Sequence, residues 1–156
     1  MHSVLSSAAG QLGLKVAFYL DYNLFGEERD MLIEQSKVVL NVHFYPQAAL
    51  EVHRIEYLLA KGKCVVSERS SDPALDSQYE GAVLFVDGGL ENLAREAVRM
   101  VTPADDTEGS GPHQRQQLAR RGLELAHDRL RFLHPLKEVL NNFSSLPFML
   151  PSSGVS

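Results

Sequence analysis

Four apolar segments of strand length restrict the fold of this chain more than any other feature. They are rich in β-branched and aromatic residues, their apolar runs are nearly continuous, and they lie at Lys15–Leu20, Lys37–Phe44, Lys63–Ser67 and Ala82–Val86. Continuous apolar runs of this length are typical of strands that are buried on both faces in a parallel sheet. We therefore expect one parallel sheet in which the residues Val38, Val39, Leu40, Val65 and Val66 are almost fully buried.

Amphipathic helical patterns separate and follow these segments. They lie at Phe25–Ser36, Leu50–Lys61, Leu90–Val101 and His113–Arg131. The interval 68–81 has room for one helical turn at most. Strands that alternate with helices predict a single three-layer α/β domain over residues 15–143. Weak patterning predicts a lead-in at 1–14, a mobile acidic loop at 102–112 and an irregular tail at 144–156.

Composition and missing motifs exclude several classes of function. The 156 residues carry a formal net charge of −5, which disfavours nucleic acid as a partner. The single cysteine, Cys64, excludes an internal disulfide and a multi-cysteine zinc site, and its place in an apolar strand predicts an inert thiol. No apolar run approaches the roughly 20 residues that span a bilayer, and no basic residue precedes an apolar N-terminal core. We expect a cytoplasmic protein with no membrane span.

Signatures of cofactor and metal chemistry are also missing from the sequence. It contains no Walker lysine motif, no glycine-rich GxGxxG after a strand, no HExxH and no GxSxG. We therefore expect neither a cofactor nor a metal, and no catalytic residue can be assigned from the residues alone.

Polar residues follow the predicted strands, where ligands bind in open parallel sheets. Asn41 and His43 end the second strand, Ser67 and Glu68 end the third, and 87–89 follow the fourth. Asn41 and His43 are either a hydrogen-bonded structural pair or one wall of a nucleotide pocket. Glu68 either caps the following turn or lines the same pocket.

Glu51 and Arg54 begin the helix after the second strand and lie three residues apart, on one helical face. A carboxylate there can accept hydrogen bonds from a ribose or sugar diol, and a guanidinium one turn later can bind a phosphate. The alternative is an ion pair on a solvated helix face.

The segments "LIEQSKVVLNVHFY", "LEVHRIEYLLAKGKCVVSE" and "YEGAVLFVDGGLENLAREAVRMV" give the chain a family resemblance. The stretch Asp30–Val101 resembles the C-terminal, donor-binding half of glycosyltransferases with the GT-B fold, nearest those similar to the spore-maturation protein CgeB. The resemblance implies a Rossmann-like domain that binds a nucleotide-diphosphate sugar. It assigns donor binding to the following residues: Asn41, His43, Glu51, Arg54, Ser67 and Glu68.

Two departures from the family pattern matter. The spacing from the glutamate to Gly62 is longer than usual, so Glu51 and Glu56 both compete for the donor-binding role; helix geometry favours Glu51, because Glu56 lies about 140° round the helix. The GT-B fold also needs an acceptor-binding domain, which has no counterpart in this sequence. Transfer is therefore expected to require such a domain or a partner chain.

Two other classes of protein compete with this hypothesis. One is a non-catalytic α/β module that binds a nucleotide or a protein. An acceptor domain encoded directly upstream would argue against this class. The other is a receiver-like signalling domain, for which Asp21 is the one acidic residue suitably placed after a strand.

Overall fold

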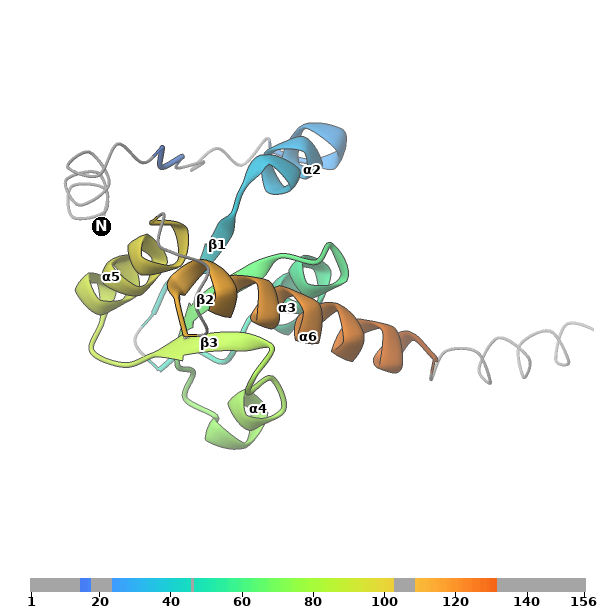
Figure 1. Cartoon of the computed structure of the whole chain (residues 1–156). Helices are drawn as coiled ribbons and strands as arrows, with labels where there is room; N and C mark the ends of the chain where they lie inside the picture. The colour runs from blue at the N-terminus through green and yellow to red at the C-terminus, as the bar shows by residue number, and fades with distance from the viewer. Residues whose placement is uncertain (1–14, 18–23, 46, 103–108, 132–156) are drawn as a thin grey trace, which may run out of the picture.

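The chain is an α/β protein with an open parallel sheet. A computed structural model describes residues 15–17, 24–45, 47–102 and 109–131 (Figure 1). Its elements, in chain order, are α2 (Gly26–Gln35), β1 (Val38–Asn41), α3 (Val52–Ala60), β2 (Cys64–Glu68), α4 (Pro73–Ser77), β3 (Val83–Val86), α5 (Leu90–Val101) and α6 (Gly111–Arg131). None of the helices in the described ranges is both long and apolar enough to cross a membrane.

The three strands β1, β2 and β3 lie side by side in that order and are all parallel. The register pairs Val39 with Val65 and Val66 with Leu84. Asn41 at the end of β1 therefore lies opposite Ser67 near the end of β2. This topology is compatible with a Rossmann-like domain, and it brings the predicted polar residues of two strands to one edge of the sheet.

Two apolar cores cover the two faces of the sheet. On one face Ile55 and Leu59 of α3 pack with Val65 and Val83, and on the other Leu93 of α5 packs with alternate residues of the same strands. Val65 and Val66 are both fully buried, as the continuous apolar pattern of β2 predicts. Burial of a Val, Leu or Ile side chain contributes about 1.5–3 kcal/mol, so these two cores provide most of the stabilisation.

The prediction that Val38, Val39 and Leu40 are almost fully buried is wrong. All three are only partly buried, because β1 has one neighbouring strand, β2, in the described part of the chain. An apolar run shows that a strand prefers to be covered, but it does not show how many neighbours the strand has.

Some element boundaries differ from the predicted ones, and several predicted segments lie outside the described residues. Residues 15–17, the start of the first predicted strand, form no strand, and its remainder at 18–20 lies outside the described residues together with Asp21. The expected lead-in 1–14 and tail 144–156 also lie outside them. Helix α6 begins at Gly111 rather than at His113, inside the interval predicted as a loop.

A glycine after α3 turns the chain into β2. Gly62 has a φ of +65°, its amide donates to the Leu59 carbonyl at 2.9 Å, and the Lys63 amide donates to the Leu58 carbonyl at 3.0 Å. This pair of bonds is a Schellman motif, in which a left-handed residue ends the helix and satisfies its last carbonyl groups. Gly62 therefore has a structural role in the sharp turn from α3 to β2.

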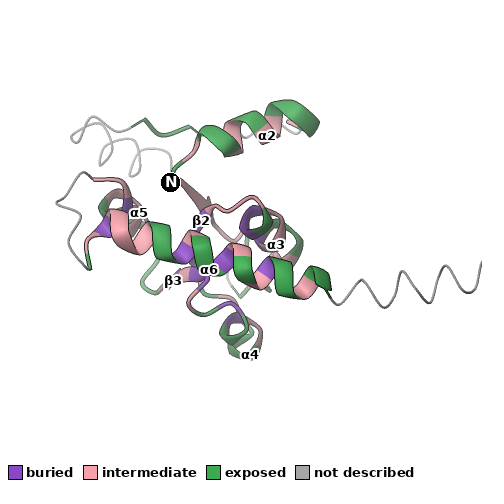
Figure 2. Ribbon diagram, turned by 45° about the vertical axis from the view of Figure 1, so that its right-hand side comes forward, coloured by how far each residue is buried: buried purple, intermediate pink, exposed green. Residues whose placement is uncertain are grey.

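Helix α6 connects the two cores. Figure 2 shows buried positions at intervals along α6. Leu118 packs into the core beneath α5, and Ala126 packs into the core beneath α3. At Gly122 the helix comes so close to α3 that a Cβ atom would lie 2.6 Å from Leu59 Cδ2. A larger residue at this position would require the buried Leu59 side chain to shift.

The thiol of Cys64 is buried and stays protonated at neutral pH. It lies in β2 and is 1% exposed. Burial raises the pKa of the thiol to about 11, so almost none of it is thiolate at neutral pH.

A polar cluster ties α2 to α3. The Asp30 carboxylate accepts hydrogen bonds from the Tyr57 hydroxyl, from Lys61 Nζ at 3.1 Å and from the Arg29 guanidinium. The hydrogen bonds from Tyr57 and Lys61 lower the pKa of Asp30 from 3.8 to about 2. The cluster is therefore strongest while this carboxylate is ionised.

This lowered pKa predicts an acid-sensitive contribution to stability. Because the folded-state pKa lies below the unfolded one, the contribution is complete above about pH 4 and is lost as the pH falls towards about 2. Wild type and Asp30→Asn, unfolded in urea at a series of pH values, should differ by a constant amount near neutrality and converge over that window. A difference that stays constant down to pH 2 would contradict the ionised cluster.

Candidate functional site

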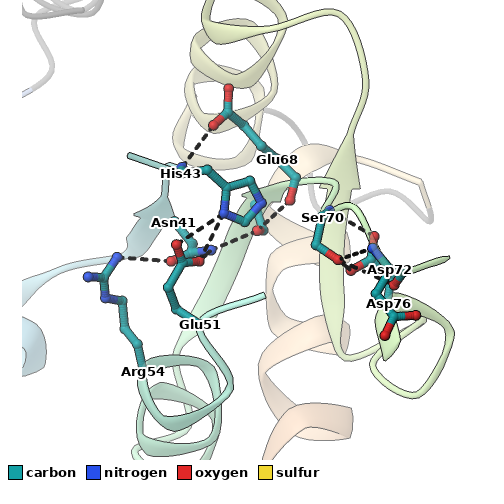
Figure 3. A network of polar contacts seen from close by, with 9 residues as sticks. Asn41, His43, Glu51, Arg54, Glu68, Ser70, Asp72 and Asp76 are labelled. Carbon is teal, nitrogen blue, oxygen red and sulfur yellow. Dashed lines mark hydrogen bonds and ion pairs between the residues drawn. The ribbon is translucent and has the colours of Figure 1, made fainter. Parts of the chain in front are cut away.

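A hydrogen-bonded cluster occupies the carboxyl ends of β1 and β2 (Figure 3). Its centre is Asn41, which is fully buried. The Asn41 side-chain amide donates to Glu51 Oε2 at 2.8 Å and to Ser67 Oγ at 3.0 Å, and its carbonyl oxygen accepts from Arg54 at 3.1 Å. One side chain thus joins β1, β2 and the beginning of α3, with both amide N–H groups donating and the carbonyl oxygen accepting one hydrogen bond.

Glu51 enters this cluster from the position just before α3. It is the N-cap residue, but its carboxylate does not cap the helix; it contacts Asn41 and His43 instead. Partial burial acts to raise the pKa of the Glu51 carboxyl, but the hydrogen bonds from Asn41 and His43 outweigh it, so the pKa is lowered. Glu51 is therefore a carboxylate at neutral pH.

His43 and Glu68 close the other side of the cluster. Nδ1 of His43 lies 3.1 Å from Glu51 Oε1 and 3.0 Å from Glu51 Oε2. The backbone amide of His43 donates to Glu68 Oε2 at 2.9 Å. Glu68 therefore holds the chain beyond β1 against β2. Capping of the next helical turn, the other role considered for Glu68, belongs to Asp72, which accepts from the Leu75 amide.

Arg54 forms the exposed part of the cluster. Its guanidinium donates to Asn41, and no ion pair joins it to Glu51 within the described ranges, so the alternative of a surface salt bridge between the two does not hold. The residue as a whole is solvent-exposed. Among the described residues only Asn41 accepts from this guanidinium, which leaves most of its five N–H donors for an anion at this edge of the sheet.

Glu56, the competing candidate for the donor-binding glutamate, lies outside the cluster at the strand ends. It accepts hydrogen bonds from the Tyr79 hydroxyl at 3.0 Å and from Arg129 of α6, whose guanidinium also lies 4.4 Å from the centre of the Tyr79 ring. Glu51, not Glu56, is thus the glutamate that lies at the strand ends.

A second cluster, which sequence reasoning missed, fixes the loop after β2. Asp76 is 1% exposed and accepts from the Ser70 amide at 3.0 Å and from the Ser70 hydroxyl at 2.7 Å. Figure 3 shows Ser70 beside Asp76 and Asp72. The sequence predicted no more than one helical turn between 68 and 81, and no periodic signal marks one of its acidic residues as buried.

Two exposed aromatic side chains beside the candidate site were also missed. Phe44 and Tyr45 directly follow His43, are 83% and 67% exposed, and contact each other edge to face at a centroid distance of 4.7 Å. The apolar pattern of the sequence extended the predicted strand to Phe44. Strand β1 instead ends at Asn41, which leaves both rings in solvent.

The third predicted segment, residues 87–89 after β3, contributes less to the candidate site than the other two. Asp87 is exposed and contacts Arg69 at 3.4 Å, and Gly89 is the N-cap residue of α5, with no side chain capping the helix.

Among the described residues, no group of three or more His, Cys, Asp or Glu side chains is arranged to hold a metal ion. Two cavities of about 250 Å³ lie away from the cluster, one between β3 and α6 and one between α3 and α6.

The chain is, at this level, an α/β protein whose open parallel sheet carries a polar cluster at its carboxyl edge. Comparison with protein-family models, with curated proteins and with solved structures finds no significant match.

Proposed function

We propose that this chain is a glycosyltransferase donor-binding domain that binds a nucleotide-diphosphate sugar at the carboxyl edge of its sheet. One observation carries the proposal: the six residues assigned to donor binding come from three separate segments and meet in one hydrogen-bonded cluster. Ligands of open parallel sheets bind at this edge. The proposed fold is one half of a GT-B architecture, and transfer itself then needs an acceptor-binding domain or partner chain.

The charge distribution supports a ligand with an anionic and a neutral part. Arg54 offers an exposed guanidinium, which suits a diphosphate and would stabilise the charge on a leaving nucleoside diphosphate. Glu51 and Glu68 lie on the other side of Asn41, next to His43. Carboxylates repel phosphate but accept hydrogen bonds from hydroxyl groups, so the sugar or ribose is expected on that side.

A thermal-shift screen against UDP, GDP, TDP and ADP tests the proposal. A ligand present at 100 times its dissociation constant adds about 2.7 kcal/mol of stability, which for a domain of this size raises the melting temperature by roughly 5–10 °C. We expect at least one diphosphate to produce this shift. The matching nucleosides, which lack the diphosphate, serve as controls and should have a much smaller effect. The absence of a shift with all four diphosphates would refute donor binding.

A further inference from the structure

The His43 imidazole has one nitrogen in use and one without a partner. Its side chain is only 7% exposed, and Nδ1 contacts the Glu51 carboxylate. Nε2 is buried and has no hydrogen-bond partner among the described residues. Buried polar atoms in folded proteins nearly always have a partner, so an unpartnered one at the proposed ligand edge indicates where a ligand binds.

Glu51 determines the hydrogen-bonding character of Nε2. The lowered pKa of Glu51 keeps it ionised, and a carboxylate can only accept hydrogen bonds. Nδ1 of His43 must therefore carry the proton in this contact. When the imidazole is neutral, the other nitrogen has a free lone pair, so Nε2 can accept a hydrogen bond.

We propose that Nε2 of His43 accepts a hydrogen bond from a hydroxyl group of the bound ligand. An ionised phosphate oxygen has no proton to donate, and two carboxylates, Glu51 and Glu68, contact this residue. Figure 3 shows Arg54 and His43 on either side of Asn41, so the anionic and the hydroxyl-bearing parts of one ligand can bind to different residues. The inference rests on the proposed function, because a nucleotide sugar supplies hydroxyl groups on its ribose and on its transferred sugar.

Two substitutions of the same kind separate this role from a general effect of losing a histidine. Asparagine places its amide near the position of Nδ1, so His43→Asn keeps a donor for Glu51 and removes only the acceptor at Nε2. The matched control is His53→Asn, because His53 lies on α3 and is exposed. Affinities for UDP and UDP-glucose, or for the equivalent pair of whichever diphosphate binds in the screen, are measured by calorimetry.

We expect His43→Asn to weaken binding roughly three- to tenfold, the worth of one neutral hydrogen bond, and His53→Asn to bind like wild type. A similar loss for both ligands places the hydroxyl on the ribose, whereas a loss confined to UDP-glucose places it on the transferred sugar. Unchanged affinity of His43→Asn for both ligands overturns the inference but leaves the proposed function standing. Failure of the wild-type protein to bind any diphosphate overturns both.

A measurement on the wild-type protein keeps the inference testable if His43→Asn does not fold. The ¹⁵N spectrum of the imidazole rings distinguishes a protonated nitrogen from one with a free lone pair. We expect Nδ1 of His43 to be protonated, and we expect saturating ligand to shift the Nε2 signal while Nδ1 changes little. An Nε2 signal that saturating ligand does not move would overturn the inference.

Discussion

Asn41→Ala is expected to lower the free energy of unfolding by about 2–3 kcal/mol, since a buried polar group that loses its partner costs about 1–3 kcal/mol. The Asn41 amide holds Glu51, Ser67 and Arg54 at once and is fully buried. Its removal leaves the Glu51 carboxylate with one contact fewer and the buried Ser67 hydroxyl without its donor. Because a domain is stable by only about 5–15 kcal/mol, this is a large fraction of the total.

The matched control for that substitution is Asn92→Ala. Asn92 on α5 also makes two side-chain hydrogen bonds, to the Asp87 carbonyl and from Arg95, but both lie at the surface. Its replacement should cost less than about 1 kcal/mol, because water replaces the lost partners. The free energies of unfolding of wild type, Asn41→Ala and Asn92→Ala are compared by urea unfolding. Equal losses in the two variants would contradict a buried cluster centred on Asn41.

Arg54→Ala is expected to weaken binding of a nucleoside diphosphate about ten- to hundredfold, because a hydrogen bond to a charged group contributes about 1.5–3 kcal/mol. Fold stability should also fall, because the buried Asn41 carbonyl oxygen loses the donor that Arg54 supplies. Glu51→Ala should weaken binding to a similar extent and should also destabilise the fold, because Asn41 and His43 both lose a contact.

Calorimetric titration with the best diphosphate from the screen measures these affinities. The matched control is Arg120→Ala on α6, where an exposed arginine lies 3.7 Å from Glu124 and away from the strand ends. It should bind the diphosphate as wild type does. If Arg54→Ala and Arg120→Ala bind the diphosphate equally well, Arg54 contacts Asn41 but does not bind the ligand.

Local patterns in the sequence predicted most of the described elements. The continuous apolar runs located β1, β2 and β3, and the helical periodicity of Leu90–Val101 matched α5 residue for residue. The partial burial of β1 could not be predicted in the same way. Burial depends on the number of neighbouring strands, which is set by contacts distant in the sequence.

The candidate site was predicted as a set of residues but not as a network. The strand pattern placed Asn41 and Ser67 at the ends of two strands, and the structure pairs them in register. Which side chain lies at the centre could not be inferred, because Asn41 reaches both Glu51 and Ser67 only when β1, β2 and α3 are assembled. The unpartnered Nε2 of His43 likewise emerges only from the folded arrangement.

The connection of the two cores by α6 has a consequence for folding during synthesis. A nascent chain that has left the ribosome only as far as Thr102 contains all three strands, but it lacks Leu118 and Ala126, which complete the two cores. The Met100 carbonyl then also lacks the hydrogen bond from Arg115. Domains fold as units, N-terminal parts first, as translation proceeds. Both apolar cores therefore remain incomplete until α6 emerges, and they gain their final packing together at that point.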